Sequence, residues 1–276
     1  MLKILKLLPL NYLSYLFGKF AEIKISWIAY LSKLVFTRLY KIDLSESELQ
    51  LSEYKSLNKF FIRNLKLGAR PLGKDPLVPV DGYLRNCGII KNSTLVQIKG
   101  IEYSLAQLLP NTEYNTKFDG GSYFAFYLAP HNYHHIHSPV SGKIISTNYV
   151  PGSLFPVTNY SVESVPGIFA VNERVITYIN SEFGLCAVVM VGATNVGKIS
   201  LSYHDLVTNQ NCGHKIQTFN HNDLPVKAGD RIGTFNLGSS VVLVFEKSGF
   251  EVRSDGELAR NLPVKYGETL INCITN

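Results

Sequence analysis

Short apolar runs alternate with Gly, Pro and Asn over most of the chain after residue 73. The runs are rich in Val, Ile and aromatic side chains, a composition that is typical of β-strands. The stretch Thr208–Asp223 is polar and rich in Asn, and it predicts a long loop. This part of the chain therefore predicts a compact β-rich sheet or barrel. Its predicted strands are Thr94–Lys99, Ser122–Leu128, Gly142–Val150, Val171–Ile179, Cys186–Val191 and Ser239–Glu246.

The residues before position 73 follow a helical spacing instead. Ser45–Glu48 resembles a helix start, and Tyr54–Leu65 has apolar residues at helical intervals. Lys24–Lys41, turned by about 100° per residue, sorts imperfectly into an apolar half and a basic half. We therefore expect an α+β fold in which N-terminal amphipathic helices precede a barrel-like or sandwich-like, β-rich core. The basic half contains Lys24, Lys33, Arg38 and Lys41, with Trp27, Leu31 and Leu34 among them.

The first 43 residues carry seven basic side chains and two acidic ones. Their longest uncharged run, Leu7–Gly18, contains Pro9 and is shorter than the roughly 20 apolar residues of a spanning helix. The sequence that follows, Gly18–Ala21, is a poor signal-peptide cleavage site. A basic amphipathic helix with Trp and Tyr suits the lipid headgroup layer, and the alternative is a helix packed on the protein's own core. We favour residues 1–44 as a segment that binds the membrane surface without crossing it.

Composition narrows the class of protein. The chain has 276 residues and a mass of 30.8 kDa, with 46% apolar and 17% charged residues, values that exclude general disorder. Its net charge of +6 (27 basic minus 21 acidic residues) does not by itself indicate a nucleic-acid partner, and we expect none. The four cysteines lack any Cys-x-x-Cys spacing, which excludes a zinc ribbon and favours a reducing compartment. No linker divides residues 45–276, which we expect to form one domain.

Four of the seven histidines lie within seven residues, between Pro130 and Pro139. Imidazole loses its proton near neutral pH, so this crowding indicates acid–base catalysis or metal binding. The flanking prolines argue against a helix. In an extended segment, His135 and His137 share one face and His134 points to the other. The alternative is a structural role, with one or two of these histidines hydrogen-bonded beneath a loop.

Asp81 and Ser239 stand in two further short motifs. Asp81 lies between a predicted strand and Gly82, a position that also suits a simple turn cap. Ser239 follows Gly238 and precedes a β-branched run, which differs from the Gly-x-Ser-x-Gly elbow of α/β-hydrolases. Each motif alone is a weak signal. With His137 they make up an acid, a base and a nucleophile, and such triads are recognised by geometry and not by their order in the sequence.

At these residues the chain resembles the bacterial phosphatidylserine decarboxylase proenzymes, from about Phe60 to Val242. Two departures from the family pattern keep the chemical groups that it needs: Ser240 replaces a Thr, and Asp230 replaces a Glu. The matching strings are Phe60-Phe61-Ile62-Arg63, Gly68-Ala69-Arg70-Pro71, Pro79-Val80-Asp81-Gly82, Lys99-Gly100, Tyr103-Ser104-Leu105, Tyr133-His134-His135-Ile136-His137-Ser138-Pro139, Pro151-Gly152-Ser153-Leu154-Phe155, Val171-Asn172-Glu173-Arg174-Val175, Val191-Gly192-Ala193-Thr194-Asn195-Val196-Gly197 and Leu237-Gly238-Ser239-Ser240.

The resemblance implies a self-made cofactor. In this family the Ser239 hydroxyl attacks the Gly238 carbonyl, and β-elimination of the resulting ester separates a β chain (1–238) from an α chain (239–276). Loss of ammonia from the dehydroalanine leaves a pyruvoyl group at position 239. This group forms a Schiff base with the amine of phosphatidylserine and supplies the electron sink that pyridoxal phosphate usually provides. The expected products are phosphatidylethanolamine and CO₂, and no metal is expected.

The resemblance also implies a role for each candidate residue. Ser239 is a weak nucleophile that needs a base within hydrogen-bond reach; His137 is the expected base, and Asp81 is expected to hold its tautomer. His134 is expected to help decarboxylation, as a proton donor or by positioning the carboxylate. The two chains are expected to stay associated, with a homodimer left open. A lipid substrate places the protein at the cytoplasmic face of the inner membrane, where basic residues favour anionic lipid.

Three other functions remain open at this point. A serine hydrolase could use Asp81, His137 and Ser239 without self-cleavage. A zinc hydrolase could use His135 and His137 as a ligand pair, although no convincing third and fourth ligands stand out. A non-catalytic lipid-binding module would have structural histidines and would release no CO₂ from phosphatidylserine.

Overall fold

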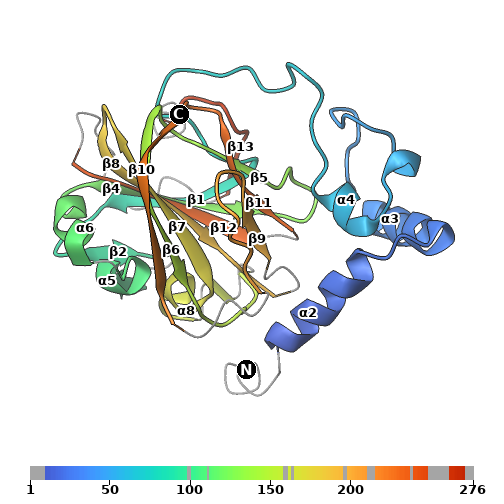
Figure 1. Ribbon diagram of the computed structural model, residues 1–276, viewed down its shortest axis with the longest axis horizontal. Coiled ribbons are helices and arrows are strands. Elements are labelled where there is room, and N and C mark those ends of the chain that lie inside the picture. The colour runs from blue at the N-terminus through green and yellow to red at the C-terminus, as the bar shows by residue number, and fades with distance from the viewer. Residues whose placement is uncertain are drawn as a thin grey trace.

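An eight-stranded antiparallel sheet forms the centre of the molecule (Figure 1). The computed structural model describes residues 10–97, 101–110, 112–157, 161–162, 165–194, 198–209, 215–236, 239–247 and 261–270. The strand order across the sheet is β10-β6-β7-β8-β12-β4-β1-β13. These strands are β1 (Gly82–Ile89), β4 (Ser122–Leu128), β6 (Gly142–Val150), β7 (Arg174–Ser181), β8 (Gly184–Val191), β10 (Gln217–Val226), β12 (Ser239–Phe245) and β13 (Leu262–Val264).

The large sheet is open. Within the described residues, the edge strands β10 and β13 each pair on one side only, so the expectation of a barrel is wrong. The expectation of a β-rich α+β fold is confirmed. Along β10 the side chains alternate between exposed and half-buried over most of its length, because one side of this strand faces solvent and carries polar residues.

Two apolar layers enclose the large sheet. A small sheet of β5 (His135–His137), β11 (Arg231–Phe235) and β9 (Ile199–Leu201) packs on one face. The other face is covered by α5 (Leu105–Leu108), α6 (Thr112–Phe118) and α8 (Ile168–Val171) together with the hairpin of β2 (Thr94–Val96) and β3 (Glu102–Ser104). The packing of the small sheet on the large one agrees with the expectation of a sandwich-like core.

Strand β12 contributes to both layers. Val241 and Leu243 belong to the core shared with the small sheet, while Val242 and Val244 belong to the core shared with the helices. All four side chains are fully buried. Successive side chains of a strand point to opposite faces, so a strand covered on both faces reads as an unbroken apolar run. This explains why β12 was predictable from the sequence.

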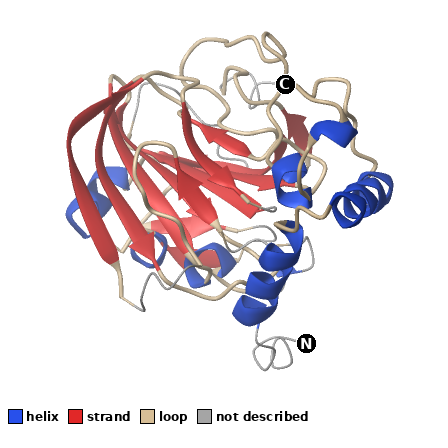
Figure 2. Cartoon of the chain, turned by 45° about the vertical axis from the view of Figure 1, so that its right-hand side comes forward, coloured by secondary structure: helices blue, strands red, loops and turns tan. Residues whose placement is uncertain are grey.

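The N-terminal helices form a separate group, visible apart from the helices on the large sheet in Figure 2. They are α2 (Leu10–Ala21), α3 (Ser26–Tyr40), η1 (Leu51–Glu53) and α4 (Leu57–Phe61). Ala21, Ile42, Phe60 and Phe61 lie in their shared apolar cluster. No helix of the described part of the chain is both long and apolar enough to span a bilayer.

Lys33 departs from its expected place on the basic, outward-facing half of α3. It is only 2% exposed, and its Nζ donates to the carbonyls of Leu51, at 2.7 Å, and Tyr54. Burial lowers the pKa of this amine. Lys33 therefore ties α3 to the segment before α4 and cannot serve as a lipid-facing cation.

Three sequence expectations about local structure need correction. Ser45–Glu48 forms a turn and an isolated bridge between Ser47 and Leu65, and it starts no helix. The predicted helix Tyr54–Leu65 shortens to α4, because the backbone after Phe61 turns toward the histidines. The predicted loop Thr208–Asp223 gives way to β10 from Gln217 onward, since an edge strand with one solvated side lacks the apolar signal of a buried strand.

Candidate active site

The Asp81, histidine and Ser239 motifs meet at one end of the large sheet. Ser239 begins β12 and pairs with Leu128, the last residue of β4. On the other side of β4, Gly82 begins β1 so close to Tyr127 that a Cβ at position 82 would lie 2.3 Å from the Tyr127 carbonyl oxygen. Asp81 therefore lies two strands away from the backbone of Ser239. Gly238 lies outside the described residues, and of Ser239 the structure describes the backbone.

The histidine segment runs alongside this end of the sheet. The backbone amide of His137 donates to the Pro79 carbonyl at 2.9 Å, and the amide of Phe235 donates to the His134 carbonyl at 2.9 Å. The histidine segment is thus hydrogen-bonded both to the residues just before Asp81 and to β11, which precedes Ser239. Ser239 is four positions after Phe235 in the chain, a reach of at most about 14 Å.

His137 is held in one tautomer by a backbone carbonyl. Its Nδ1 lies 2.6 Å from the Gly229 oxygen, which can only accept, so the proton is on Nδ1. Its Nε2 is then an acceptor, 3.1 Å from the Tyr133 hydroxyl. The Tyr266 ring stacks on the imidazole at 3.9 Å. Burial lowers the pKa of His137 to about 4, so the ring is neutral at pH 7 and can accept a proton.

The turn that presents this carbonyl contains one of the two departures from the family pattern. Asp230 closes the turn, because its Oδ2 accepts from the amide of Lys227 at 2.8 Å. Gly229 has a φ of +85°, a left-handed conformation that side chains other than glycine rarely adopt. The shorter side chain of Asp230 therefore keeps the bond that the turn requires.

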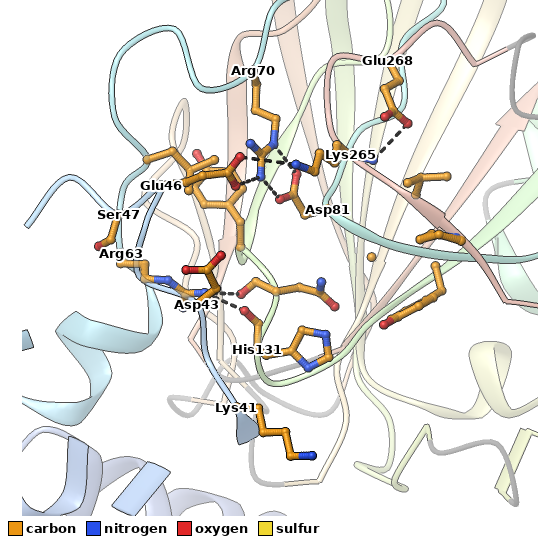
Figure 3. Close-up of a pocket in the computed structure, with 17 residues that line it drawn as sticks. Lys41, Asp43, Glu46, Ser47, Arg63, Arg70, Asp81, His131, Lys265 and Glu268 are labelled. Atoms are coloured by element: carbon orange, nitrogen blue, oxygen red, sulfur yellow. Dashed lines mark hydrogen bonds and ion pairs between the residues drawn. The ribbon is translucent and has the colours of Figure 1, made fainter. Parts of the chain in front are cut away.

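Asp81 acts on His137 through its charge. Its Oδ1 accepts from Arg70 Nε at 3.1 Å and its Oδ2 from Arg70 Nη2 at 2.5 Å (Figure 3). Its Oδ1 also accepts from the amide of Tyr266 at 2.9 Å. The expected hydrogen bond that would fix the tautomer of His137 is therefore made by the Gly229 carbonyl and not by Asp81. The negative charge of Asp81 still favours the protonated form of His137.

His134 is fully buried and presents one free nitrogen. Its Nδ1 lies 2.8 Å from the Asn132 carbonyl, so the proton is on Nδ1, and its Nε2 has no partner within the described residues. The Phe61 ring lies 4.0 Å away, centroid to centroid. Burial keeps the pKa of His134 well below its usual value. The residue is therefore a buried, neutral acceptor that packs on an aromatic ring.

His135 has a structural role. Its Nδ1 lies 2.8 Å from the Thr234 hydroxyl and its Nε2 lies 3.0 Å from the Ile62 carbonyl. Both nitrogens of His135, and both of His137, are occupied by protein groups. Across the described residues, no three or more His, Cys, Asp and Glu side chains are gathered as in a metal site. The extended backbone expected for His135 and His137 is confirmed, since both lie in β5.

Comparison with known proteins agrees with this arrangement. Residues 57–272 match the family described as phosphatidylserine decarboxylase. The chain belongs to this family. It is 39% identical to the phosphatidylserine decarboxylase proenzyme of Anaeromyxobacter sp. (strain K), over 96% of this chain and 95% of the relative. It is 40% identical to the proenzyme of Shewanella loihica, over 91% of each chain, and 34% identical to that of Myxococcus xanthus, over 98% and 96%.

The structure explains why a second family motif accompanies the histidines. The segment from Phe60 to Arg63 begins in the last turn of α4 and contacts His134, His135 and the backbone of His131. Phe61 packs on His134, the Ile62 carbonyl bonds to His135, and Arg63 Nη2 donates to the His131 carbonyl at 2.6 Å. The sequence contains this motif but gives no sign of which groups it contacts.

Proposed function

We propose that this chain is a proenzyme that cleaves itself between Gly238 and Ser239 and then converts phosphatidylserine to phosphatidylethanolamine and CO₂. The observation that carries the proposal is the meeting of Asp81, the neutral His137 and the start of β12 at one end of the sheet. Membership of the phosphatidylserine decarboxylase family supports it.

The first reaction is an acyl shift that needs a neutral base. The Ser239 hydroxyl loses its proton to His137 and attacks the Gly238 carbonyl, so that the peptide becomes an ester. Removal of the α-proton of residue 239 then expels Gly238 as a carboxylate. The dehydroalanine that remains takes up water and releases ammonia, which leaves a ketone. His137 suits the first step because burial keeps the ring neutral at pH 7. The Gly229 carbonyl holds its proton on Nδ1, so Nε2 can accept the Ser239 proton once the Tyr133 hydroxyl releases it.

The residues at this end of the sheet fit a buried keto group. Ser240 is 1% exposed, and His134 is fully buried with its Nε2 unpartnered among the described residues. A ketone at position 239 supplies an electron sink for the electrons of the breaking C–C bond. Loss of CO₂ removes a carboxylate charge, so the apolar surround of Phe61 and His134 favours the reaction. His134 Nε2 carries no proton in this tautomer, so it would first take one up. It would then position the substrate carboxylate or return the proton to its carbon.

The fold supports lasting association of the two chains. The α chain would begin at β12, which lies between β4 and β8 in the middle of the sheet. Further along, β13 pairs with β1, and Tyr266 contacts both His137 and Asp81. Cleavage at position 238 therefore leaves every one of these contacts in place.

The N-terminal helices support binding to a membrane surface. Large apolar side chains on them are exposed, with Trp27 at 70%, Leu39 at 68% and Tyr12 at 60%. Lys19, Lys24 and Arg38 are exposed beside them. Such a face suits the headgroup layer of an anionic leaflet. We propose that the protein is peripheral, on the cytoplasmic face of the inner membrane.

The test of the proposed reaction is the Ser239→Ala chain beside a Ser240→Ala control. Ser239→Ala should remain a single chain and release no CO₂ from phosphatidylserine, because no other hydroxyl takes its place. Ser240→Ala should still be cleaved between residues 238 and 239. Normal cleavage of Ser239→Ala would overturn the assignment. A wild-type chain that stays whole and reacts with serine-directed acylating probes would indicate a hydrolase.

A further inference from the structure

A polar cleft of about 460 Å³ lies beside Asp81, between the core and the segment that follows α3 (Figure 3). Tyr133, which hydrogen-bonds to His137, lines it on the side of the active site. Lys41, the residue at the end of α3, lines it on the side of the N-terminal helices. The cleft therefore connects the candidate active site with the segment that we expect to bind the membrane.

Two of the cations in the cleft, Arg70 and Lys265, form ion pairs with carboxylates. Arg70 bonds to Asp81 and to Glu46, at 2.5 and 2.8 Å. Lys265 lies 3.3 Å from Glu46. These pairs make one neutralised network on the wall next to β1, so they leave little capacity for an additional anion there.

Arg63 is a buried cation of this cleft that has no ion pair with any residue that the structure describes. It is 4% exposed, and its Nη2 donates to the carbonyls of His131, at 2.6 Å, and Asn132, at 3.4 Å. Its Nη1 has no hydrogen-bond partner, and no carboxylate lies within ion-pair distance in the part of the chain that the structure describes. Asp81 and Asp43 are near enough to act on Arg63 by their charges. Asp81 bonds to Arg70, however, and both oxygens of Asp43 accept from Ser45.

A buried guanidinium with a free N–H is costly unless an anion completes it. Arginine is well suited to phosphate, because its planar fork bonds to two oxygens at once. In phosphatidylserine the phosphorus is four bonds from the amine nitrogen. An amine at position 239 therefore keeps the phosphodiester close to the histidine segment, and the cleft that Tyr133 and Arg63 line offers a place for it. Arg63 bonds to this same segment at residues 131 and 132.

We propose that Arg63 Nη1 donates to the phosphodiester of the substrate headgroup, which makes this cleft the headgroup subsite, with Lys41 at its lipid side. This inference rests on the proposed function. Nη1 is covered in the structure, so the side chains over it must shift as the phosphate enters. The same chemistry would admit free phosphate, and the experiment below separates the two sources.

The test uses the self-cleaved, full-length protein and two water-soluble amino acids. Glycerophosphoserine and O-methylserine share an amine and a carboxylate, and only the first has a phosphodiester. Each is incubated with the protein and cyanoborohydride, and the mass added to the 239–276 chain gives the concentration for half-maximal trapping. The variants are Arg63→Gln, Arg63→Lys and, as a control of equal charge change, Lys59→Gln on the exposed side of α4.

We expect wild type to trap glycerophosphoserine at a concentration at least tenfold lower than O-methylserine. Arg63→Gln should abolish this preference without changing the concentration for half-maximal trapping of O-methylserine. Arg63→Lys should keep part of the preference for glycerophosphoserine, and Lys59→Gln should keep all of it. Equal losses for both compounds would mean that Arg63 only shapes the histidine segment, which overturns the proposal. Wild type without a preference would also overturn it, even if the Arg63 variants do not fold.

Two further outcomes distinguish a headgroup phosphate from free phosphate, and failure of the subsite from failure of the proposed function. Competition by inorganic phosphate as strong as that by glycerophosphoethanolamine would assign the site to free phosphate and overturn the headgroup subsite. A wild-type chain that is not cleaved and traps neither compound would refute the proposed function itself. A cleaved chain that traps both compounds equally refutes the subsite alone.

Discussion

Replacing Asp81 by Asn should weaken both the fold and the base. The carboxylate holds the buried Arg70 guanidinium through two bonds. With a neutral amide at position 81, the remaining carboxylate partner of Arg70 is Glu46, whose side chain is 41% exposed. Two unit charges about 4 Å apart attract by about 4 kcal/mol at an effective dielectric constant near 20. Removing one partner of a buried ion pair costs about 3–5 kcal/mol. Because Glu46 remains, we expect the low end of that range, about 3 kcal/mol.

A double-mutant cycle isolates the pair from these other effects. Asp81→Asn, Arg70→Met and the double variant are unfolded in urea on a Ser239→Ala background, so that all remain single chains. We expect an interaction free energy of about 2 kcal/mol, within the range found for residues in contact. In the cleavable chain, Asp81→Asn should also slow self-cleavage, since its charge favours protonated His137. An interaction free energy near zero would refute the structural argument, and an unchanged cleavage rate would refute the electrostatic one.

Three other outcomes follow from the site and the helices. Burial lowers the pKa of His137 to about 4, whereas an unfolded histidine has a pKa of about 6.5. The unfolded chain therefore binds more protons between these values, and the free energy of unfolding should fall as the pH drops through them. His137→Gln should remove its share of that slope, and a slope identical to wild type would contradict the lowered pKa. His134→Ala should cleave, at least partly, yet release CO₂ slowly in single-turnover assays; full activity would remove its role. Trp27→Ser with Leu39→Ser should lower sedimentation with anionic vesicles at least tenfold, and unchanged sedimentation would place the membrane contact elsewhere.

The elements that the sequence predicts well are strands whose two faces are buried over most of their length. The predicted strand Ser122–Leu128 coincides with β4, and Gly142–Val150 coincides with β6. The predicted strand Val171–Ile179 starts too early, because residue 171 ends α8 and the strand begins at Arg174. Apolar periodicity alone does not separate a buried helical turn from a buried strand.

The candidate site was predictable as a set of residue types and not as a set of contacts. The imidazole of His137 is oriented by Gly229, which lies 92 residues away, and is stacked on Tyr266 from the C-terminal segment. Long-range contacts of this kind follow from how the sheets pack, and no local pattern encodes them. Lys33 shows the same limit, because its place on the basic half of α3 gave no sign of the carbonyls that bury it.

The most direct test of the account follows cleavage and chemistry together in the unaltered chain. Intact-mass spectra are taken during maturation, and CO₂ release from phosphatidylserine is measured on the same samples. We expect two polypeptides, residues 1–238 and a 239–276 fragment that is lighter by one ammonia than its serine-started form, with activity rising in proportion to the cleaved fraction. Decarboxylation of phosphatidylserine by a sample whose chain is still whole would contradict the account.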